Sequence, residues 1–258
     1  TAGAVGVDVR SIELFDRRCL ELIRSEGKLD AIPLDVPDDA SACLLFEQEI
    51  GRDFSEQQLL DRLVDALEGR PHAGDPLGEI VGVLHSFDAV ERTEIALPSQ
   101  GRRQKQLAAV REAIPLSVSD WLQRQKKTHS AIHKVAGDMI VPFEHFGEMM
   151  ARYYDAFQRR EVDVAIFGHI SDGNVHPNSL PRDPEQMARA KEALLELADE
   201  AKRLGGCPLS EHGVGKHPLK KQMLARYWGP DVIAQMRAIK GAFDPGWTLA
   251  RGVFFDAD

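Results

Sequence analysis

The sequence predicts an α+β fold in which a sheet is covered by helices. Short apolar segments typical of buried strands occur at residues 40–50, 139–141 and 162–167. They alternate only loosely with segments whose apolar residues recur at helical spacing, and several of those helices come in pairs. This order favours a mixed α+β domain whose sheet is covered by helices on one side.

Apolar periodicity and end signals predict the individual elements. Ser55 followed by Gln58 resembles a capping box that opens a helix, Gly205-Gly206 is typical of a left-handed helix end, and Gly229-Pro230 divides two helices. The helices expected are 9–26, 56–69, 78–90, 102–114, 143–159, 185–204, 218–227 and 231–243. Residues 91–97 and 207–210 are predicted as further strands, residues 71–76 as a loop, and residues 116–133 fit neither pattern.

Composition limits the class of protein. The 258 residues are 43% hydrophobic and 28% charged, enough for one large domain or two small ones. A net charge of −9 argues against a nucleic-acid partner, because such binders need clustered positive charge. The three cysteines, Cys19, Cys43 and Cys207, form no CxxC pair and fit a reducing compartment. No signal-peptide pattern and no apolar run long enough to cross a membrane are found.

The stretch at residues 167–178 is the first that predicts chemistry. A buried strand leads into a loop of Ser, Asp, Gly, Asn and Pro, residues that form tight turns, so the loop can bring His169 and His176 together. Two imidazoles in one loop are good ligands for a borderline metal ion. Asp172 and Asn174 are candidates for holding these ligands in orientation. The alternative is a pair of capping or surface histidines on a turn.

A second stretch adds a carboxylate. Glu211 and His212 are adjacent at the end of another short strand, followed by Gly213 and Gly215, which permit close backbone approach. Two histidines and one carboxylate form a three-ligand set that leaves positions open for a substrate. His212 would then be available for acid–base chemistry near neutral pH. Taken alone, this stretch favours a salt-bridged glutamate and a solvent-facing histidine at the start of a loop over a metal site.

Three segments together resemble the C-terminal domain of the FAD-linked oxidases. This group includes D-lactate dehydrogenase, the glycolate oxidase D subunit and D-2-hydroxyglutarate dehydrogenase, within the vanillyl-alcohol-oxidase class. The segments are HISDGNVHPN at 169–178, EHGVGKHPL at 211–219 and MRAIKGAFDPGWTLARGVFF at 236–255. The chain departs from the family pattern at Ser171 for a glycine, at Ala108 for a tryptophan, and at Ala250-Arg251 for Asn-Pro.

The resemblance implies a ferredoxin-like substrate domain over residues 1–258, with an antiparallel sheet covered by helices, and a role for each candidate residue. It implies that His169, His176 and Glu211 bind a divalent metal, zinc or manganese. It implies that His212 takes the proton of the substrate hydroxyl. Arg111 and Lys134 match the positions at which the family holds the substrate carboxylate. The implied reaction oxidises a small D-2-hydroxy acid of lactate, glycolate or 2-hydroxyglutarate type to the 2-oxo acid.

The resemblance also implies FAD, held mainly by an N-terminal FAD-binding domain that is not among these residues. The sequence has no glycine-rich phosphate loop between a strand and a helix. We therefore expect that domain to be the partner of this chain and expect the chain to be inactive on its own. Where the last helices and the tail would contact the FAD-binding domain, we expect an exposed apolar face. Gly213 is the candidate flavin contact. The sequence does not identify the electron acceptor, and it allows a homodimer. The expected location is cytoplasmic or peripheral at the inner face of the membrane.

Two other classes of function fit the same residues. A stand-alone metal hydrolase would use His169, His176 and Glu211 to activate water instead of an alcohol. A non-catalytic binding or assembly module would keep the fold and lose the redox role, and the changes at Ala108 and in the tail favour it.

Overall fold

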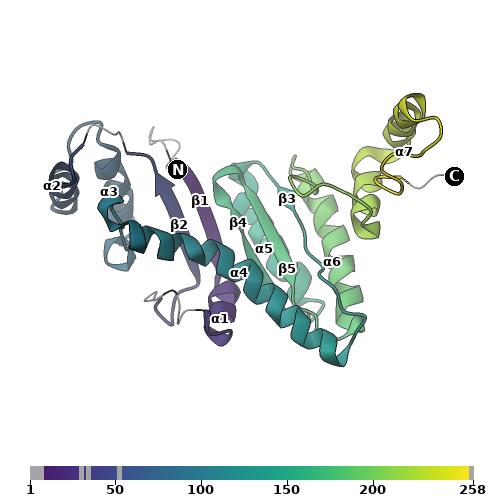
Figure 1. Ribbon diagram of the computed structural model, residues 1–258, viewed down its shortest axis with the longest axis horizontal. Coiled ribbons are helices and arrows are strands. Elements are labelled where there is room, and N and C mark those ends of the chain that lie inside the picture. Colours follow the sequence, from purple (N-terminus) through teal and green to yellow (C-terminus); the bar gives the residue numbers. More distant parts are fainter. Residues whose placement is uncertain (1–8, 29–31, 33–35, 51–53, 256–258) are drawn as a thin grey trace.

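The computed structural model describes residues 9–28, 32, 36–50 and 54–255. Five strands form one sheet in the order β2-β1-β4-β5-β3, and all neighbouring strands are antiparallel. Their bounds are β1 Val9–Asp16, β2 Ala42–Gln48, β3 Met139–Ile140, β4 Val164–His169 and β5 Asn174–Ser179. With seven α-helices around this sheet, the predicted α+β class is confirmed (Figure 1).

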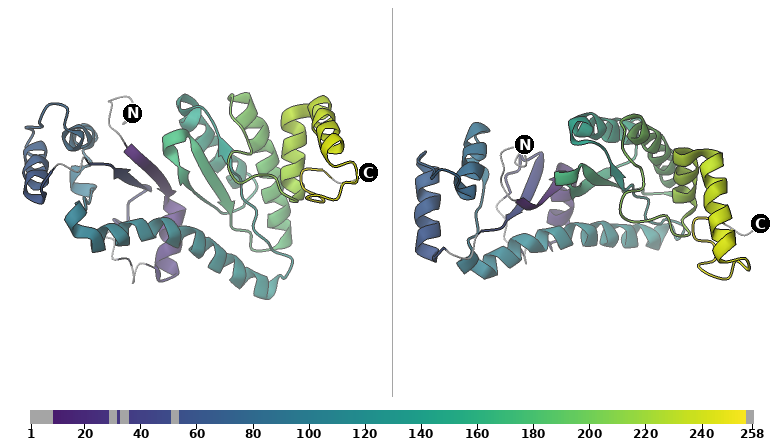
Figure 2. Two further views of the ribbon diagram at one scale, coloured as in Figure 1. Left: turned by 45° about the horizontal axis from the view of Figure 1, so that its top comes forward. Right: turned by 90° about the horizontal axis from the view of Figure 1, so that it is seen from above.

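Helices cover both faces of the sheet, so the expectation that they lie on one side was wrong. Adjacent residues of a strand point to opposite faces, and Leu14 and Phe15 of β1 belong to two separate hydrophobic clusters. Leu14 packs in the cluster of α5 (Phe146–Gln158) and α6 (Pro184–Arg203). Phe15 packs in that of α1 (Arg17–Ser25) and α4 (Gly101–Thr128). Figure 2 shows α4 along one face and α5 and α6 on the other.

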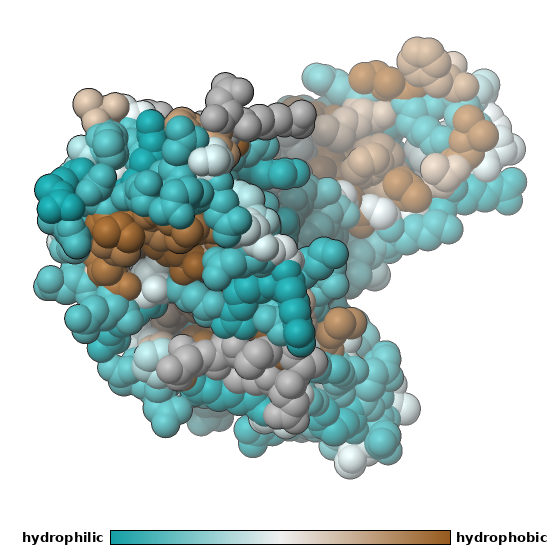
Figure 3. Space-filling view, turned by 60° about the vertical axis from the view of Figure 1, so that its left-hand side comes forward, coloured by the Kyte–Doolittle hydropathy of each residue, from teal (hydrophilic) through white to brown (hydrophobic). Residues whose placement is uncertain are grey.

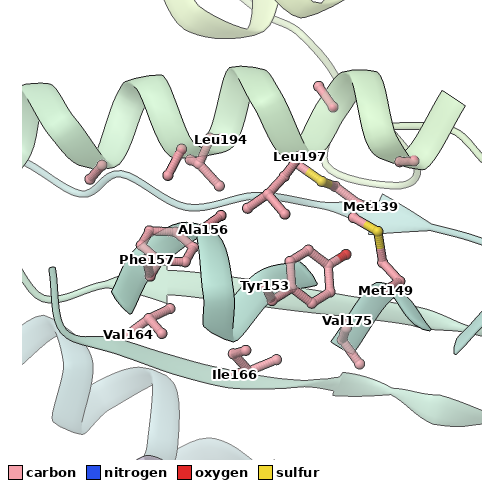
Figure 4. Packing of buried hydrophobic residues seen from close by; sticks show 14 of the residues in the cluster. Met139, Met149, Tyr153, Ala156, Phe157, Val164, Ile166, Val175, Leu194 and Leu197 are labelled. Atoms are coloured by element: carbon pink, nitrogen blue, oxygen red, sulfur yellow. The ribbon is translucent and has the colours of Figure 1, made fainter. Parts of the chain in front are cut away.

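The larger cluster holds the sheet to α5 and α6. Tyr153 and Phe157 of α5 lie between α6 and the strands, next to Leu194 and Leu197, and both aromatic side chains are fully buried (Figure 4). Burial of two aromatic side chains contributes several kcal/mol, at about 25 cal/mol per Å² of apolar surface. This packing makes β4 and β5 a rigid base for any site on the opposite face.

The predicted helix over 9–26 was wrong in its first half, which forms β1. The apolar residues of 9–16 fit helical spacing, but the segment pairs with β2 and β4 instead. Asp16 separates strand from helix, because its extended backbone ends β1 and its carboxylate accepts a hydrogen bond from the backbone N–H of Cys19 at 2.9 Å. Only α1 of the predicted helix remains.

Helix α4 is longer than predicted and passes through Pro115. The expected helix over 102–114 and the unassigned residues 116–128 form one element. Side-chain hydroxyls help to satisfy carbonyls around the proline: Ser119 donates to the Pro115 carbonyl at 2.9 Å and Ser117 to Ala113 at 2.8 Å. The strand predicted over 91–97 does not form, since this stretch holds a 3-10 turn, Val90–Arg92, followed by irregular chain.

The residues after Phe167, predicted as a loop, form the end of β4, the turn and the second strand of a hairpin. The 3-10 turn Ile170–Asp172 joins β4 to β5. Gly173 has a φ of 75°, and an added Cβ would come within 2.3 Å of the Val141 carbonyl oxygen. Gly168 is also confined, because a Cβ there would meet the Asn174 carbonyl oxygen at 2.8 Å. These close approaches explain why the turn contains glycines.

The other predicted elements are confirmed within a few residues. Ser55 and Gln58 form the capping box of α2, Glu56–Leu67, and α3 covers Pro76–Ser86. Gly205 ends α6 with a φ of 78°. The last helix, α7, covers Pro218–Phe243 and is broken at Gly229, where φ is 79° and ψ is 169°.

Residues 207–210 were predicted as a strand and form isolated bridges instead. Cys207 pairs with Ile140, and Leu209 with Asp138. Because this segment joins the sheet only through such bridges, the ferredoxin-like arrangement stays a prediction.

The two ends of the molecule expose apolar side chains. On α2, Leu60, Val64 and Leu67 recur at helical spacing on an outer face, and Figure 3 shows apolar surface at this end within a mostly hydrophilic face. At the other end, the exposed residues of α7 and the tail are Trp228, Ile239, Phe243, Leu249 and Phe254. The second set agrees with the apolar face expected there. None of the helices that the structure describes is long and apolar enough to cross a membrane.

Residues 206–207 approach β3 so closely that adding a methyl group at Gly206 should destabilise the fold. A Cβ on Gly206 would lie 2.1 Å from the Ile140 carbonyl oxygen and 2.9 Å from the Val141 Cα, both backbone atoms. We expect Gly206→Ala to lower the free energy of unfolding by about 2 kcal/mol or more in urea titrations. Gly82→Ala on α3, where a Cβ meets open space, is the control and should raise it by up to about 1 kcal/mol. Equal stability of Gly206→Ala and the wild type would contradict this close approach.

Candidate functional site

The candidate site is a cavity of about 490 Å³ on the face of the sheet that also carries α4. Strand register explains why its residues share that face. Glu13 of β1 lies opposite His169 of β4, and His176 of β5 lies opposite Phe167. Residues two apart on a strand point the same way, so His169 and Phe167 share a face with His176 and Glu13. Phe15, on this same face, packs against α1 and α4.

Three imidazoles meet at one carboxylate oxygen. The Oε1 atom of Glu211 lies 3.0 Å from the Nε2 atom of His176, 3.3 Å from that of His212 and 3.4 Å from that of His169. The rings of His169 and His176 are nearly perpendicular, with centroids 5.7 Å apart, and those of His176 and His212 are 4.5 Å apart. The structure therefore brings together the four residues that the two sequence stretches supplied.

Two further carboxylates, those of Glu13 and Asp138, contact the histidines and the backbone of Glu211 and His212. Both oxygens of Glu13 lie 2.9 Å from the Nδ1 atom of His169, which leaves Nε2 directed at Glu211. Asp138 accepts hydrogen bonds from the backbone N–H groups of Glu211, at 3.0 Å, and His212, at 2.6 Å. Its other oxygen is buried, has no hydrogen bond to any residue that the structure describes, and lies 3.7 Å from the Nδ1 atom of His176. A carboxylate that accepts a hydrogen bond from an imidazole, as Glu13 does from His169, fixes the tautomer and direction of that ring.

Burial keeps His176 neutral. Its side chain is only 8% exposed, and desolvation, together with the nearby His212, lowers its pKa from 6.5 to about 4. The neutral imidazole is the form that binds metal ions, so no proton has to leave His176 near pH 7 before it can act as a ligand.

Cationic side chains stand around the rest of the cavity. Arg111 of α4 lies in its wall and pairs with Glu13, Nη2 to Oε1, at 2.9 Å. Lys134 and Lys220 also line it. Desolvation lowers the pKa of Lys134, and the charge of Lys220 adds to the effect. The two residues expected to hold a carboxylate, Arg111 and Lys134, are thus brought to the same cavity as the histidines, although 22 residues separate them in the chain.

The donor set fits a divalent metal ion. A carboxylate oxygen has room for about two good hydrogen bonds in its plane, whereas three imidazole nitrogens surround Glu211 Oε1. A mixed imidazole and carboxylate set is the kind that zinc and similar borderline ions prefer. Geometry alone groups Asp138, His176, Glu211 and His212, whose donor atoms lie within 4.8 Å of one another. His169 lies outside this group, but its Nε2 atom also approaches the Glu211 Oε1 atom, at 3.4 Å.

Other predicted residues lie further from this centre. Asp172 is exposed at the hairpin turn, and its carboxylate accepts from the Ser171 hydroxyl at 3.3 Å instead of facing the imidazoles. Asn174 is buried and donates to the Ser210 hydroxyl at 3.3 Å, which ties the hairpin to the segment before Glu211. Gly213 is exposed with a φ of 66°, and its carbonyl accepts from Lys220 at 2.8 Å.

Sequence reasoning missed Glu13 and Asp138. Glu13 was hidden because residues 9–16 were interpreted as a helix with charge on its outer side. The available signal was a single acid between Ile12 and Leu14 in a strand-like segment. Asp138 directly precedes β3 and is 2% exposed, but a lone aspartate at the start of a strand is common and indicates nothing by itself.

Comparison with known proteins places this arrangement in a family. Residues 1–253 match the family described as FAD linked oxidases, C-terminal domain. The chain is 26% identical over 250 residues to glycolate oxidase subunit GlcD of Bacillus subtilis, covering 96% of this chain and 45% of the relative. It is 40% identical over 253 residues to an uncharacterized FAD-linked oxidoreductase of Mycobacterium tuberculosis, covering 98% and 47%.

A more distant similarity is to D-2-hydroxyglutarate dehydrogenase of Escherichia coli, 24% identical over 251 residues, which cover 91% of this chain and 22% of the relative. The chain thus spans less than half the length of these relatives. Since the match extends over nearly all of its residues, the chain belongs to the family of FAD-linked oxidase C-terminal domains.

Proposed function

We propose that this chain is the substrate- and metal-binding half of a FAD-dependent oxidoreductase that converts a D-2-hydroxy acid to the 2-oxo acid. The observation that carries the proposal is the meeting of three imidazole nitrogens at Glu211, in a cavity whose wall holds Arg111 and Lys134. Relatives named for glycolate oxidation and for D-2-hydroxyglutarate dehydrogenation support this substrate class.

His169, His176 and Glu211 are the proposed metal ligands. Glu13 directs His169 through Nδ1, and burial keeps His176 neutral. A divalent metal bound there would supply a Lewis acid that lowers the pKa of the substrate hydroxyl. A ligand set of three leaves room for the hydroxyl and a carboxylate oxygen of the substrate.

His212 is the proposed proton acceptor. Its side chain is 52% exposed, so it can exchange the proton with solvent, and Asp138 fixes its backbone N–H. Its Nε2 atom points to the same centre as the ligands. A base must lie within hydrogen-bond reach of the proton that it takes, and a hydroxyl held at the metal would satisfy this.

Arg111 and Lys134 are proposed to bind the substrate carboxylate. Arg111 keeps two planar N–H edges, and its pairing with Glu13 uses only part of them. Fixing the carboxylate on one side and the hydroxyl on the other orients the C2–H bond. The family implies FAD as the hydride acceptor, which would be bound mainly by an N-terminal domain outside these residues.

Metal content is the first test. We expect about one zinc or manganese ion per chain after loading and desalting, and loss of that ion in the double variant His169→Ala/His176→Ala, measured by plasma mass spectrometry. His85→Ala, an exposed position on α3, is the control and should keep the metal. Equal metal content in the double variant and the wild type would rule out these ligands.

The role of His212 predicts a separation of binding from turnover. In the enzyme joined to its FAD-binding half, His212→Ala should keep the metal and lower kcat by about 100-fold or more, the typical contribution of general acid–base catalysis. Loss of metal in this variant would instead make His212 a ligand.

Hydrolysis of a model ester by the isolated chain, without flavin, would favour the metal-hydrolase alternative.

His176 predicts a pH dependence of stability in the metal-free chain. Its folded-state pKa of about 4 lies below the ordinary 6.5, so between these values the unfolded chain binds one more proton and stability falls as pH falls. The expected loss is about 3 kcal/mol between pH 6.5 and pH 4. Urea titrations at several pH values should show this slope in the wild type and a smaller one in His176→Gln. Identical slopes in both proteins would contradict a neutral, desolvated His176.

A further inference from the structure

Lys220 has no role in the function proposed so far. It lies in the first turn of α7 and lines the same cavity as Arg111, Lys134 and the histidine cluster. One of its three N–H groups donates to the Gly213 carbonyl at 2.8 Å. An ammonium group has three donors, so two remain for a ligand.

The charges around the cavity are not balanced near Lys220. On the histidine side, Arg111 pairs with Glu13, and Glu211 faces the imidazoles. Among the residues that the structure describes, no carboxylate forms a salt bridge with Lys134 or with Lys220. Two unpaired ammonium groups in one cavity repel each other, so the charge of Lys220 adds to desolvation, which is the main cause of the lowered pKa of Lys134. In a chain with a net charge of −9, such a pair is unusual.

A neighbouring imidazole extends this cationic region. His217 also lines the cavity, and its Nδ1 atom is buried without a hydrogen-bond partner in the described part of the chain. Burial and the charge of Lys220 lower its pKa, so it is a neutral group able to donate one hydrogen bond. An unsatisfied buried polar atom is costly unless a ligand or water meets it.

We infer that Lys220 and His217 form a second anion subsite, which takes the distal carboxylate of a 2-hydroxy dicarboxylic acid. The inference rests on the proposed function and adds the substrate class to it. Arg111 and Lys134 would hold the first carboxylate, next to the reacting carbon. A monocarboxylic acid would leave Lys220 without an anion, whereas a dicarboxylic acid would balance both lysines.

The test compares two acids that differ only in the distal group. D-2-hydroxyglutarate ends in a carboxylate and D-2-hydroxyvalerate in a methyl group. In isothermal titration of the Mn²⁺-loaded 258-residue chain, we expect the dicarboxylic acid to bind at least about tenfold more tightly, since a charge-assisted hydrogen bond is added. Lys220→Met should remove the preference and change the affinity for hydroxyvalerate by less than about twofold.

Two variants separate a binding role from a structural one. Lys220→Arg keeps the charge and should keep most of the preference. Lys216→Met removes an exposed lysine outside the cavity lining and should leave the preference for the dicarboxylic acid unchanged. Equal affinities of the wild type for the two acids, or a preference that survives in Lys220→Met, would overturn the subsite alone. Failure of the wild type to bind either acid would overturn the hydroxy-acid function and the subsite together.

Discussion

The antiparallel register of β1, β4 and β5 is the constraint on which the site depends. It sets Glu13 opposite His169 and Phe167 opposite His176, so that the alternation of side chains delivers all four to one face. A shift by one residue would turn both imidazoles into the core of α5 and α6. The hydrophobic cluster on that side, with Val164, Ile166 and Val175, resists such a shift because these residues would then face the cavity.

Asp138 connects this face to the rest of the site. Residues 207–210 have only isolated bridges to the sheet, so backbone pairing alone leaves Glu211 and His212 weakly fixed. A buried carboxylate that accepts from both of their N–H groups supplies the missing restraint. One oxygen thus positions a proposed ligand and a proposed base, while the other faces His176. Gly206 makes this approach possible, because a side chain there would collide with the Ile140 carbonyl.

The cavity joins elements from both halves of the chain, with opposite chemical character on its sides. The hairpin and residues 211–212 supply imidazoles and carboxylate, suited to a cation. The other side is lined by three cationic residues, which suit anions. Arg111 lies in α4, Lys134 in the segment that follows α4, and Lys220 at the start of α7. A ligand with a hydroxyl near one side and carboxylates toward the other fits this division. The continuity of α4 through Pro115 matters here, since it keeps Arg111 in the helix that crosses the sheet.

The sequence by itself indicated which residue types gather in the cavity and where most of the helices lie. The spacing of His169 and His176 around a glycine-containing turn, and the adjacent Glu211 and His212, indicated which residues could meet, because turn formers and ligand types are local properties. Capping at Ser55 and the breaks at Gly205 and Gly229 were likewise local. The tertiary structure decided that residues 9–16 form a strand, that helices cover both faces, and that Glu13 and Asp138 support the histidines. Those outcomes depend on pairing and burial between residues far apart in the chain, such as Asp16 with Ala42 and Glu13 with His169, which no local pattern records.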